Sequence, residues 1–316
     1  MKVLVTGANG FVGGWLVQAL LAAGYDVVGA DRPGTSRDGR LSKGQRAAVR
    51  WVPLELDDPA SVREVAAIPC DALVHLAAVA SGGEALRDPG VAWSVNAGGT
   101  ARLLGELGRL KCAGALDPLI VVASTAEVYG GEALRPLVET DPVAPRSPYA
   151  ASKLGAELAA RETAARTGLR VVVARAFPHT GPGQDNRFVA PAFAERLRVA
   201  VRAGARVVKV GNLEPVRDFL DVRDVAAAYV ALLARGLPDD LYNVASGTGV
   251  KLSELFERLA AIIGVDAIPE ADAQLVRPSD IPYLVGDAGK LRAATLWRPA
   301  ITLEQSLRDM VDAQAH

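Results

Sequence analysis

The chain has 316 residues, half of them hydrophobic, and its 35 basic and 36 acidic side chains leave a net charge of −1. This balance provides no positive field for a nucleic acid or an anionic membrane, and charges interrupt every apolar run well short of the ~20 residues that span a bilayer. Two cysteines outside any CxxC motif and three dispersed histidines predict neither disulfides nor a metal site.

The chain opens directly on a strand pattern, without the regions of a signal peptide, which predicts a cytoplasmic protein. Short apolar runs then alternate with helical patterns. The strand patterns lie at residues 2–6, 26–30, 49–54, 72–76, 119–123 and 169–174. The helical patterns lie at residues 11–23, 60–67, 91–110 and 149–167. Because the strands are apolar on both faces, they predict a doubly wound α/β domain whose parallel sheet is covered by helices on both sides.

The pattern changes after about residue 176, where prolines and glycines punctuate the chain. Helical patterns follow at residues 189–203, 222–235, 252–264 and 302–313, with short strands at 206–210 and 241–244. We therefore expect residues 1–175 to form one domain, completed by segments from 205–245. Residues 176–316 are expected to form mainly a smaller, mixed α/β lobe that closes over the edge of the sheet and binds the substrate.

Three glycines stand between the first strand and the first helix, at Gly7, Gly10 and Gly13. Gly7 permits the tight turn, Gly10 lets the backbone approach a pyrophosphate, and Gly13 lets the helix pack close to the strand. An apolar strand before and an amphipathic helix after provide the context that this motif needs. The segment predicts a Rossmann-like dinucleotide site whose lining also includes Asn9, Phe11 and Val12.

The second strand ends at Asp31, where a carboxylate can hold the ribose hydroxyls of an adenosine. Such a carboxylate repels the 2′-phosphate of NADP, so the sequence favours NAD. Arg32 follows at once and could accept that phosphate, which keeps NADP as the alternative. Residues 246–251 superficially resemble a phosphate loop, but their spacing is wrong and we interpret them as a turn before a helix.

Tyr149 and Lys153 lie four residues apart at the start of a predicted helix, and therefore on one face. An ammonium about 5 Å from a phenolate, at an effective dielectric near 20, favours the phenolate by roughly 3 kcal/mol. Tyr149 is then expected to act as an acid or base near neutral pH. Ser124 and Thr125 follow a strand at the carboxyl edge of the sheet, where a hydroxyl can hydrogen-bond the reacting oxygen.

An ordered set of motifs resembles the extended short-chain dehydrogenase/reductase family, the NAD-dependent epimerase/dehydratase enzymes of nucleotide-sugar metabolism. The motifs are TGxxGxxG at 6–13, LVHLAA at 73–78, VNAGGT at 95–100, STAEVYG at 124–130, PYAASK at 148–153 and RDFLDV at 217–222. The segments ARAFPHTGPGQ at 174–184 and VGNLEPVRDF at 210–219 look most like GDP-4-dehydro-6-deoxy-mannose reductases and GDP-mannose 4,6-dehydratases.

The resemblance implies a role for each matching position. Thr125 corresponds to the catalytic hydroxyl, Tyr149 to the acid/base, and Lys153 to the residue that lowers its pKa and holds the nicotinamide ribose. The positions that would line the cofactor are Leu56, Leu76, Ala77, Ala78 and Asn96. Arg217, Arg277 and Asp280 resemble the cluster that grips the nucleotide diphosphate, a task suited to arginine. Further substrate-binding candidates are Ser124, His179, Asn186, Arg187 and Val210.

The resemblance leaves several activities open. The leading prediction is a nicotinamide-dependent reductase acting on C4 of a GDP-linked 4-keto-6-deoxy-hexose. Its first rival is an NAD-dependent nucleotide-sugar 4-epimerase, which uses the same Tyr149 and Lys153. A 4,6-dehydratase is third, since Glu127 occupies the position of the dehydratase base, although Ala126 replaces the acid of glucose-type dehydratases. A non-catalytic dinucleotide sensor would not need this side-chain set. Relatives commonly pair through the helices at 91–110 and 149–167, so we expect a homodimer.

Overall fold

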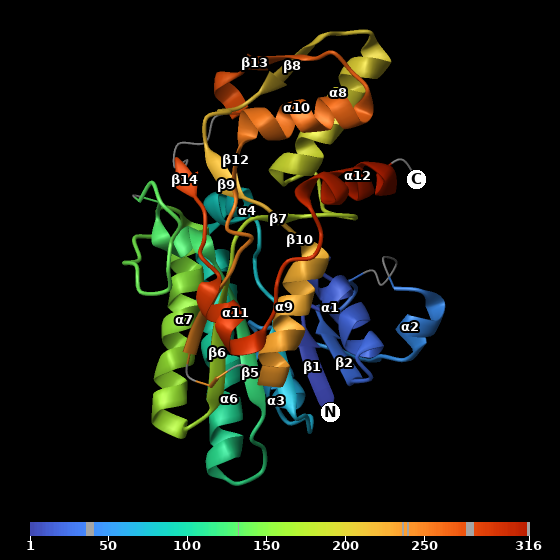
Figure 1. Cartoon of the computed structure of the whole chain (residues 1–316). Helices are drawn as coiled ribbons and strands as arrows, with labels where there is room; N and C mark the ends of the chain where they lie inside the picture. Colours follow the sequence, from blue (N-terminus) through green and yellow to red (C-terminus); the bar gives the residue numbers. More distant parts are fainter. Residues whose placement is uncertain (36–40, 132, 236, 239, 276–280, 315–316) are drawn as a thin grey trace.

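A computed structural model of the chain describes residues 1–35, 41–131, 133–235, 237–238, 240–275 and 281–314. Its centre is a seven-stranded sheet in the order β11-β6-β5-β4-β1-β2-β3, with every neighbouring pair parallel (Figure 1). The strands are β1 (Lys2–Thr6), β2 (Asp26–Asp31), β3 (Arg50–Pro53), β4 (Ala72–His75), β5 (Leu119–Thr125), β6 (Arg170–Ala176) and β11 (Asp240–Val244). The predicted doubly wound parallel fold is confirmed.

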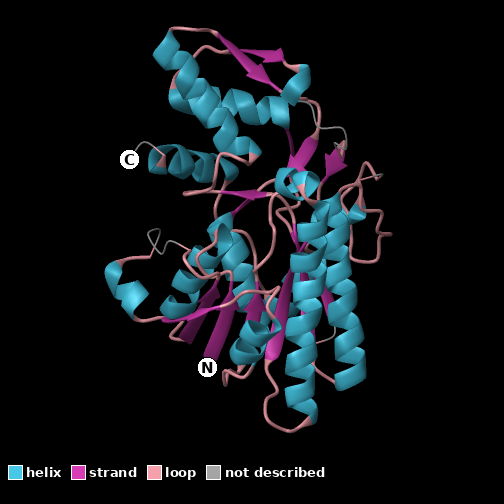
Figure 2. Ribbon diagram, turned by 180° about the vertical axis from the view of Figure 1, so that it is seen from behind, coloured by secondary structure: helices cyan, strands magenta, loops and turns pink. Residues whose placement is uncertain are grey.

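Helices cover both faces of this sheet because its strands bury side chains on both sides. Along β1, Val3 and Val5 join one hydrophobic cluster and Leu4 joins the other. The first cluster packs against α1 (Phe11–Ala22), α9 (Val222–Arg235) and α11 (Gly289–Thr295). The second packs against α3 (Pro59–Ala66), α6 (Thr100–Cys112) and α7 (Pro148–Thr167). In Figure 2, α6 and α7 stand side by side over one face of the sheet.

A third hydrophobic cluster forms the smaller lobe at the top of Figure 1. Its helices are α8 (Val189–Ala203), α10 (Leu252–Ile263) and α12 (Leu303–Ala313), and its strands β8 (Val207–Val210) and β13 (Ile268–Ala271) pair in parallel. Between this lobe and the sheet, β9 (Val216–Asp218) pairs with β12 (Gly249–Lys251) and β14 (Tyr283–Leu284), and β7 (His179–Thr180) with β10 (Leu220–Asp221). These short strands join the lobe to the carboxyl edge of the sheet.

The predicted helix at 91–110 is not continuous in the structure. Residues Pro89–Ala92 form α5, Trp93–Gly99 form a π-helical segment (η1), and regular α-helix resumes with α6. The π-segment contains Asn96, whose side chain hydrogen-bonds to Val79 and Ser152. The apolar spacing correctly predicted a helical region, but not the π-helical segment, which occurs where Asn96 contacts distant parts of the chain.

Several short elements lack a periodic sequence signal. They are α2 (Lys43–Ala47), α4 (Gly82–Arg87), η2 (Ala126–Tyr129) and η3 (Ala273–Leu275). Within residues 246–251, only the first half is the predicted turn, and β12 occupies the second half. Among the described residues, none of the helices combines the length and the apolar character required to span a membrane.

Candidate active site

The turn after β1 brings three backbone segments into close contact. Gly7 has φ +71°, and a Cβ there would lie 2.9 Å from the backbone nitrogen of Ala77. A Cβ on Gly13 would lie 2.1 Å from the carbonyl oxygen of Gly7. Glycine is therefore required at both positions, the first for its conformation and the second for the packing of α1 on the turn. This geometry fits a turn that binds the pyrophosphate of a dinucleotide, as the glycine motif predicted.

Asp31 lies at the end of β2, beside this turn. One carboxylate oxygen accepts a hydrogen bond from the Asn9 backbone N–H at 2.7 Å, and the other from the Arg32 backbone N–H at 2.9 Å. The carboxylate is thereby fixed next to the glycine segment while the Arg32 side chain is exposed. An acid held in this position can accept hydrogen bonds from ribose hydroxyls.

The catalytic candidates come from the adjacent ends of β5 and α7. α7 starts at Pro148 because Ser147 caps it, with its hydroxyl accepting the backbone N–H of Ala150 at 3.1 Å. The first turn then presents Tyr149, which is hydrogen-bonded to Thr125 at the end of β5. Thr125 also accepts the backbone N–H of Glu127 at 3.3 Å. The structure thus brings a hydroxyl, a phenol and a carboxylate together.

Lys153 lies one turn further along α7 and is buried. Its ammonium donates to the carbonyl oxygen of Ala123 at 2.5 Å. Burial lowers the pKa of Lys153 to about 8, and the nearby negative charge of Glu157 limits this decrease. The lysine is therefore held in place by the strand that also carries Thr125.

The structure corrects the expected effect on Tyr149. Burial raises the pKa of its phenol, the negative charge of Glu127 raises that pKa further, and the hydrogen bond from Thr125 opposes the rise. The pKa of the phenol is therefore raised and not lowered as expected from the spacing to Lys153, and Tyr149 is protonated at neutral pH. A protonated phenol is suited to donating a proton.

Ser124 is not part of this group. Successive side chains of a strand point to opposite faces, so Ser124 faces away from Thr125 and its hydroxyl donates to Glu157. Glu157 also accepts two hydrogen bonds from Arg175, at 2.9 and 2.7 Å, in a fully buried ion pair. The prediction of Ser124 as a substrate contact is therefore corrected. The sequence signal for the buried pair was an acidic residue four positions after Lys153, on the same helix face.

The cofactor candidates that follow β4 lie at the same edge of the sheet. The parallel register places His75 next to Thr6 of β1 and next to Val122 of β5. Leu76, Ala77 and Ala78 come directly after His75 and are partly exposed. Asn96 is buried, and Leu56 is buried against Gly99, where a Cβ would lie 2.8 Å from the Leu56 side chain.

His179 contacts the start of α1, beside the dinucleotide turn. Its ring stacks on Phe11, at the start of α1, with centroids 6.1 Å apart and an interplanar angle of 5°. Its Nδ1–H donates to the carbonyl oxygen of Phe177 at 3.0 Å. Burial lowers the pKa of His179, so the imidazole is neutral. Since Phe11 borders the glycine turn, His179 lies close to both predicted binding regions.

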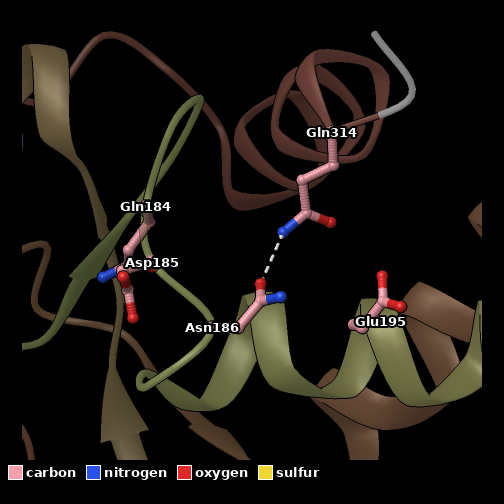
Figure 3. Close-up of a pocket in the computed structure, with 5 residues that line it drawn as sticks. All are labelled: Gln184, Asp185, Asn186, Glu195 and Gln314. Atoms are coloured by element: carbon pink, nitrogen blue, oxygen red, sulfur yellow. Dashed lines mark hydrogen bonds between the residues drawn. The ribbon is translucent and has the colours of Figure 1, made fainter. Parts of the chain in front are cut away.

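A polar pocket of about 350 Å³ opens beside the loop that follows β7 (Figure 3). It is lined by Gln184, Asp185, Asn186, Glu195 and Gln314. Asn186 accepts a hydrogen bond from the Gln314 amide at 3.2 Å, which joins the loop to the end of α12. The neighbouring Arg187 pairs with Asp185 and with Glu84 of α4, each at 2.9 Å.

The expected diphosphate cluster is described only in part. Arg217, on β9, donates to the carbonyl oxygens of Ile281 at 2.5 Å and Val216 at 3.0 Å. Arg277 and Asp280 lie outside the described residues. Val210 is corrected from a substrate contact to a core residue, because its side chain is buried in the third cluster and its carbonyl accepts from Asp272.

The segment 246–251 is not available to hold a phosphate. The backbone N–H groups of Ser246 and Gly247 donate to the carboxylate of Asp218, each at 2.9 Å. Gly286 donates to the same carboxylate at 3.2 Å. The amides that would bind a phosphate are thus paired with an acidic side chain of the protein itself.

A sequence profile of GDP-mannose 4,6 dehydratase matches residues 4–310. The chain belongs to this family. It is 37% identical to the GDP-6-deoxy-D-mannose reductase of Pseudomonas aeruginosa, over 97% of this chain and 95% of that protein. It is also 30% identical to the UDP-glucose 4-epimerase of Streptomyces lividans, over 95% of this chain and 92% of that protein.

Solved structures agree with this family assignment. RMD from Pseudomonas aeruginosa complexed with NADPH superposes with a TM-score of 0.81 at 36% identity, covering 99% of this chain and 98% of that one. The UDP-glucose 4-epimerase of Thermus thermophilus in complex with NAD has a TM-score of 0.84 at 32% identity, covering 99% and 98%. The predicted membership of the extended short-chain dehydrogenase family, its NAD(P)-dependent enzyme class and its nucleotide-sugar substrates are confirmed.

Proposed function

We propose that this chain is a reductase that converts C4 of a GDP-linked 4-keto-6-deoxy-hexose to an alcohol. The observation that carries this proposal is the hydrogen bond between the Thr125 hydroxyl and the Tyr149 phenol, which places two proton-donating groups where a carbonyl oxygen would be reduced. The 37% identity to a GDP-6-deoxy-D-mannose reductase across nearly the whole of both chains supports the substrate class.

In the proposed reaction, Thr125 and Tyr149 both hydrogen-bond the ketone oxygen and polarise the carbonyl. The bound reduced nicotinamide supplies the hydride that forms the new C–H bond. As negative charge develops on the oxygen, Tyr149 transfers its phenolic proton to it and yields the alcohol. The Lys153 ammonium then stabilises the resulting phenolate until solvent returns a proton. Two electrons and two protons are thus added across the C=O bond.

We propose NAD(H) as the preferred cofactor. The Asp31 carboxylate is fixed by Asn9 and Arg32 backbone N–H groups at the place where a ribose 2′-substituent would lie. A 2′-phosphate would approach this negative charge, whereas two ribose hydroxyls would donate to it. NADP(H) remains the alternative to be measured, since RMD from Pseudomonas aeruginosa holds NADPH.

The proposal is tested by supplying a GDP-4-keto-6-deoxy-hexose with NADH or NADPH and following nicotinamide absorbance and the sugar product. We expect NADH oxidation with one equivalent of alcohol formed, and a loss of about 10²- to 10⁴-fold in kcat for Tyr149→Phe. Tyr25→Phe, at the amino end of β2, is the matched control and is expected to retain full activity. Full activity of Tyr149→Phe would remove the phenol from the mechanism.

The same assay separates the rival functions. Similarity to 4-epimerases is high, with a TM-score of 0.87 to the Thermotoga maritima UDP-glucose 4-epimerase at 27% identity, covering 100% of this chain and 99% of that one. Tightly held NAD and interconversion of C4 epimers without net oxidation would establish epimerisation instead. Formation of a 4-keto sugar from GDP-mannose would establish dehydration, for which Glu127, beside Tyr149, is the base candidate.

We further propose that the enzyme works as a homodimer in the cytoplasm. Free Cys70 and Cys112 fit a reducing compartment. Leu158 of α7 is 60% exposed, and this helix is the expected dimer surface.

A further inference from the structure

A line of hydrogen bonds, most of them buried, runs from the end of β1 to the first turn of α7 and passes through the backbone carbonyl and the side chain of Asn96. It starts at Thr6 Oγ1, which lies 2.7 Å from Nδ1 of His75. Nε2 of the same ring lies 3.0 Å from Oγ1 of Thr100, which donates to the carbonyl oxygen of Asn96 at 2.6 Å. The Asn96 amide donates to Ser152 Oγ at 2.9 Å, and Ser152 donates to the carbonyl oxygen of Tyr149, also at 2.9 Å.

Counting protons along this line favours one tautomer of the His75 imidazole. The single hydroxyl proton of Thr100 is used on the Asn96 carbonyl, so Thr100 Oγ1 can only accept from His75. Nε2 of His75 therefore carries the proton. Nδ1 is then a lone pair that accepts from the Thr6 hydroxyl, and Thr6 in turn accepts the backbone N–H of Ala77 at 3.2 Å. The other tautomer would set two lone pairs against each other at Thr100.

A second proton on the ring would also break the line. Nδ1–H would then donate to Thr6 Oγ1, and the Thr6 hydroxyl proton would lose the acceptor that Nδ1 provides. Burial and the charge of Lys153 lower the pKa of His75 to about 3, so the ring is neutral wherever the enzyme works. All the donors on this line then point in one direction, from β1 toward α7.

Both ends of the line hold backbone that borders the proposed reaction site. At one end, Thr6 fixes Ala77, whose backbone lies against Gly7 of the dinucleotide turn. Midway, Asn96 holds Val79 through two hydrogen bonds, at 2.8 and 3.1 Å. At the other end, Ser152 holds the carbonyl of Tyr149 itself. The line therefore connects the dinucleotide site with the residue proposed to donate the proton.

We propose that His75 is a positioning residue, which acts as a neutral imidazole that links Thr6 to Thr100. Through these hydrogen bonds it holds the cofactor-facing segment 76–79 in place. Through Asn96 and Ser152 it holds the first turn of α7 in a fixed position relative to that segment. This inference rests on the proposed dinucleotide-dependent function. Neither ring nitrogen reaches the reacting atoms, so its effect is carried by the backbone that it orders.

The test uses Thr100, because its substitutions change hydrogen bonding with little change in volume. Thr100→Val leaves the His75 Nε2–H without its acceptor and the Asn96 carbonyl without its donor, whereas Thr100→Ser keeps both bonds. We expect Thr100→Val to weaken dinucleotide binding, measured by calorimetry, and to lower kcat, each by about tenfold. Thr100→Ser is expected to restore both quantities to within about twofold of wild type.

Two further variants separate positioning from general destabilisation. Thr163→Val removes a buried hydroxyl on α7, the helix that carries Tyr149 and Ser152, but this hydroxyl is not part of the line of hydrogen bonds. The variant is expected to leave dinucleotide affinity and kcat unchanged. His75→Phe keeps an aromatic ring without either bond and is expected to match Thr100→Val or exceed it. Dinucleotide affinity and kcat of all variants are measured at a temperature below the unfolding transition of the least stable one. If His75→Phe does not fold, the comparison of Thr100→Val with Thr100→Ser suffices.

The results have distinct meanings. Wild-type affinity and kcat in folded Thr100→Val, or an equal loss in Thr100→Ser, would overturn the inference about His75. Failure of the wild-type protein to bind NADH or NADPH by calorimetry would instead overturn the proposed function. Normal binding and turnover in wild type with a selective loss in Thr100→Val would support both.

Discussion

The Lys153 ammonium lies between α7 and β5, paired with a carbonyl of the strand that also carries Thr125. Its surroundings disfavour the charge by burial more than the Glu157 carboxylate favours it. Tyr149 experiences the same burial, which for a phenol disfavours the ionised form. Burial therefore favours the neutral form of both side chains, which raises the pKa of the phenol and lowers the pKa of the ammonium. The phenol retains its proton while the lysine releases its proton more readily.

This difference predicts an alkaline limit on activity. With a pKa of about 8, Lys153 is protonated below pH 8 and loses its charge as the pH rises through that value. Because we propose that the ammonium holds the ribose and stabilises the phenolate, kcat/KM for the reduction is expected to fall tenfold per pH unit above about pH 8. The measurement is a kcat/KM profile from pH 6 to pH 10, roughly the range that spans this pKa.

Lys153→Arg supplies the control for this assignment. Arginine stays protonated throughout the range, so the residual activity of this variant should show no decline near pH 8. A wild-type profile that is flat to pH 10, or a decline that persists unchanged in Lys153→Arg, would show that another group sets the limit. The Tyr149→Phe variant cannot serve here, because it removes the proton donor itself.

At the scale of helices and strands, glycine serves different purposes in α1 and α6. A Cβ on Gly13 would lie 2.1 Å from the Gly7 carbonyl oxygen and 2.8 Å from the carbonyl carbon of Ala8, both of them backbone atoms that cannot move aside. A Cβ on Gly105, in the middle of α6, would meet no atom within 4 Å. The first glycine permits the helix to pack on the turn, and the second only adds flexibility to the unfolded chain.

Alanine at these two positions is therefore expected to act in opposite directions. Gly13→Ala should destabilise the fold by about 1–3 kcal/mol or more through overpacking, and should abolish dinucleotide binding. Gly105→Ala should stabilise it by about 0.5–1 kcal/mol, because alanine has the better helix propensity. Urea unfolding and calorimetric titration with NADH check both statements. Tolerance of Gly13→Ala would contradict the close approach of α1 to the turn.

The same elements show what the sequence could predict and what it could not. The glycine turn was predictable because the positive φ of Gly7 and the contact of Gly13 with Gly7 arise within a single strand–turn–helix unit, whereas the contact of Gly7 with Ala77 carries no local signal. The strand pattern alone did not distinguish Ser124 from Thr125, since both end the same strand; the resemblance to the family assigned the catalytic hydroxyl to Thr125, and the layers around the sheet turn Ser124 away from it. The π-helical segment was also beyond prediction, because Asn96 is held by Val79 and Ser152, which are distant in the sequence.

Tyr149 illustrates a further limit. The spacing to Lys153 correctly indicated that the two lie on one helix face, but the pKa of the phenol depends mainly on burial and on Glu127. Burial is produced by the whole fold, and no local pattern carries it. The ordered motifs nevertheless identified Thr125, Tyr149 and Lys153 as a set, and the structure places them at adjacent ends of β5 and α7.

In the whole molecule, α1 connects the dinucleotide turn with the smaller lobe. Phe11 at its start stacks on His179, and the Trp15 indole N–H donates to the carbonyl of Pro182 at 3.3 Å. The helix that supports the glycine turn therefore also contacts the loop that leads to Asn186 and the polar pocket of Figure 3. Because one element borders both regions, their relative placement follows from the packing of α1.

The outer surface of α7 belongs to the same scale, since it concerns how two chains would meet. Ala150, Ala156 and Ala160 are buried, whereas Leu158 is 60% exposed. Trp93, which is 47% exposed, packs on Gly155, where a Cβ would lie 2.9 Å from its ring. An apolar side chain exposed on a long helix, next to an exposed tryptophan, is typical of a surface that a second copy covers.

We therefore expect the protein to be a dimer at micromolar concentration, as measured by light scattering, and Leu158→Arg to convert it to a monomer because burial would leave the arginine unpaired. Val201→Arg is the matched control. Val201 is 50% exposed on α8, in the smaller lobe, so its substitution should leave the dimer intact. A monomeric wild-type protein would contradict the dimer. A dimer that survives Leu158→Arg but dissociates in Val201→Arg would move the interface from α7 to the smaller lobe.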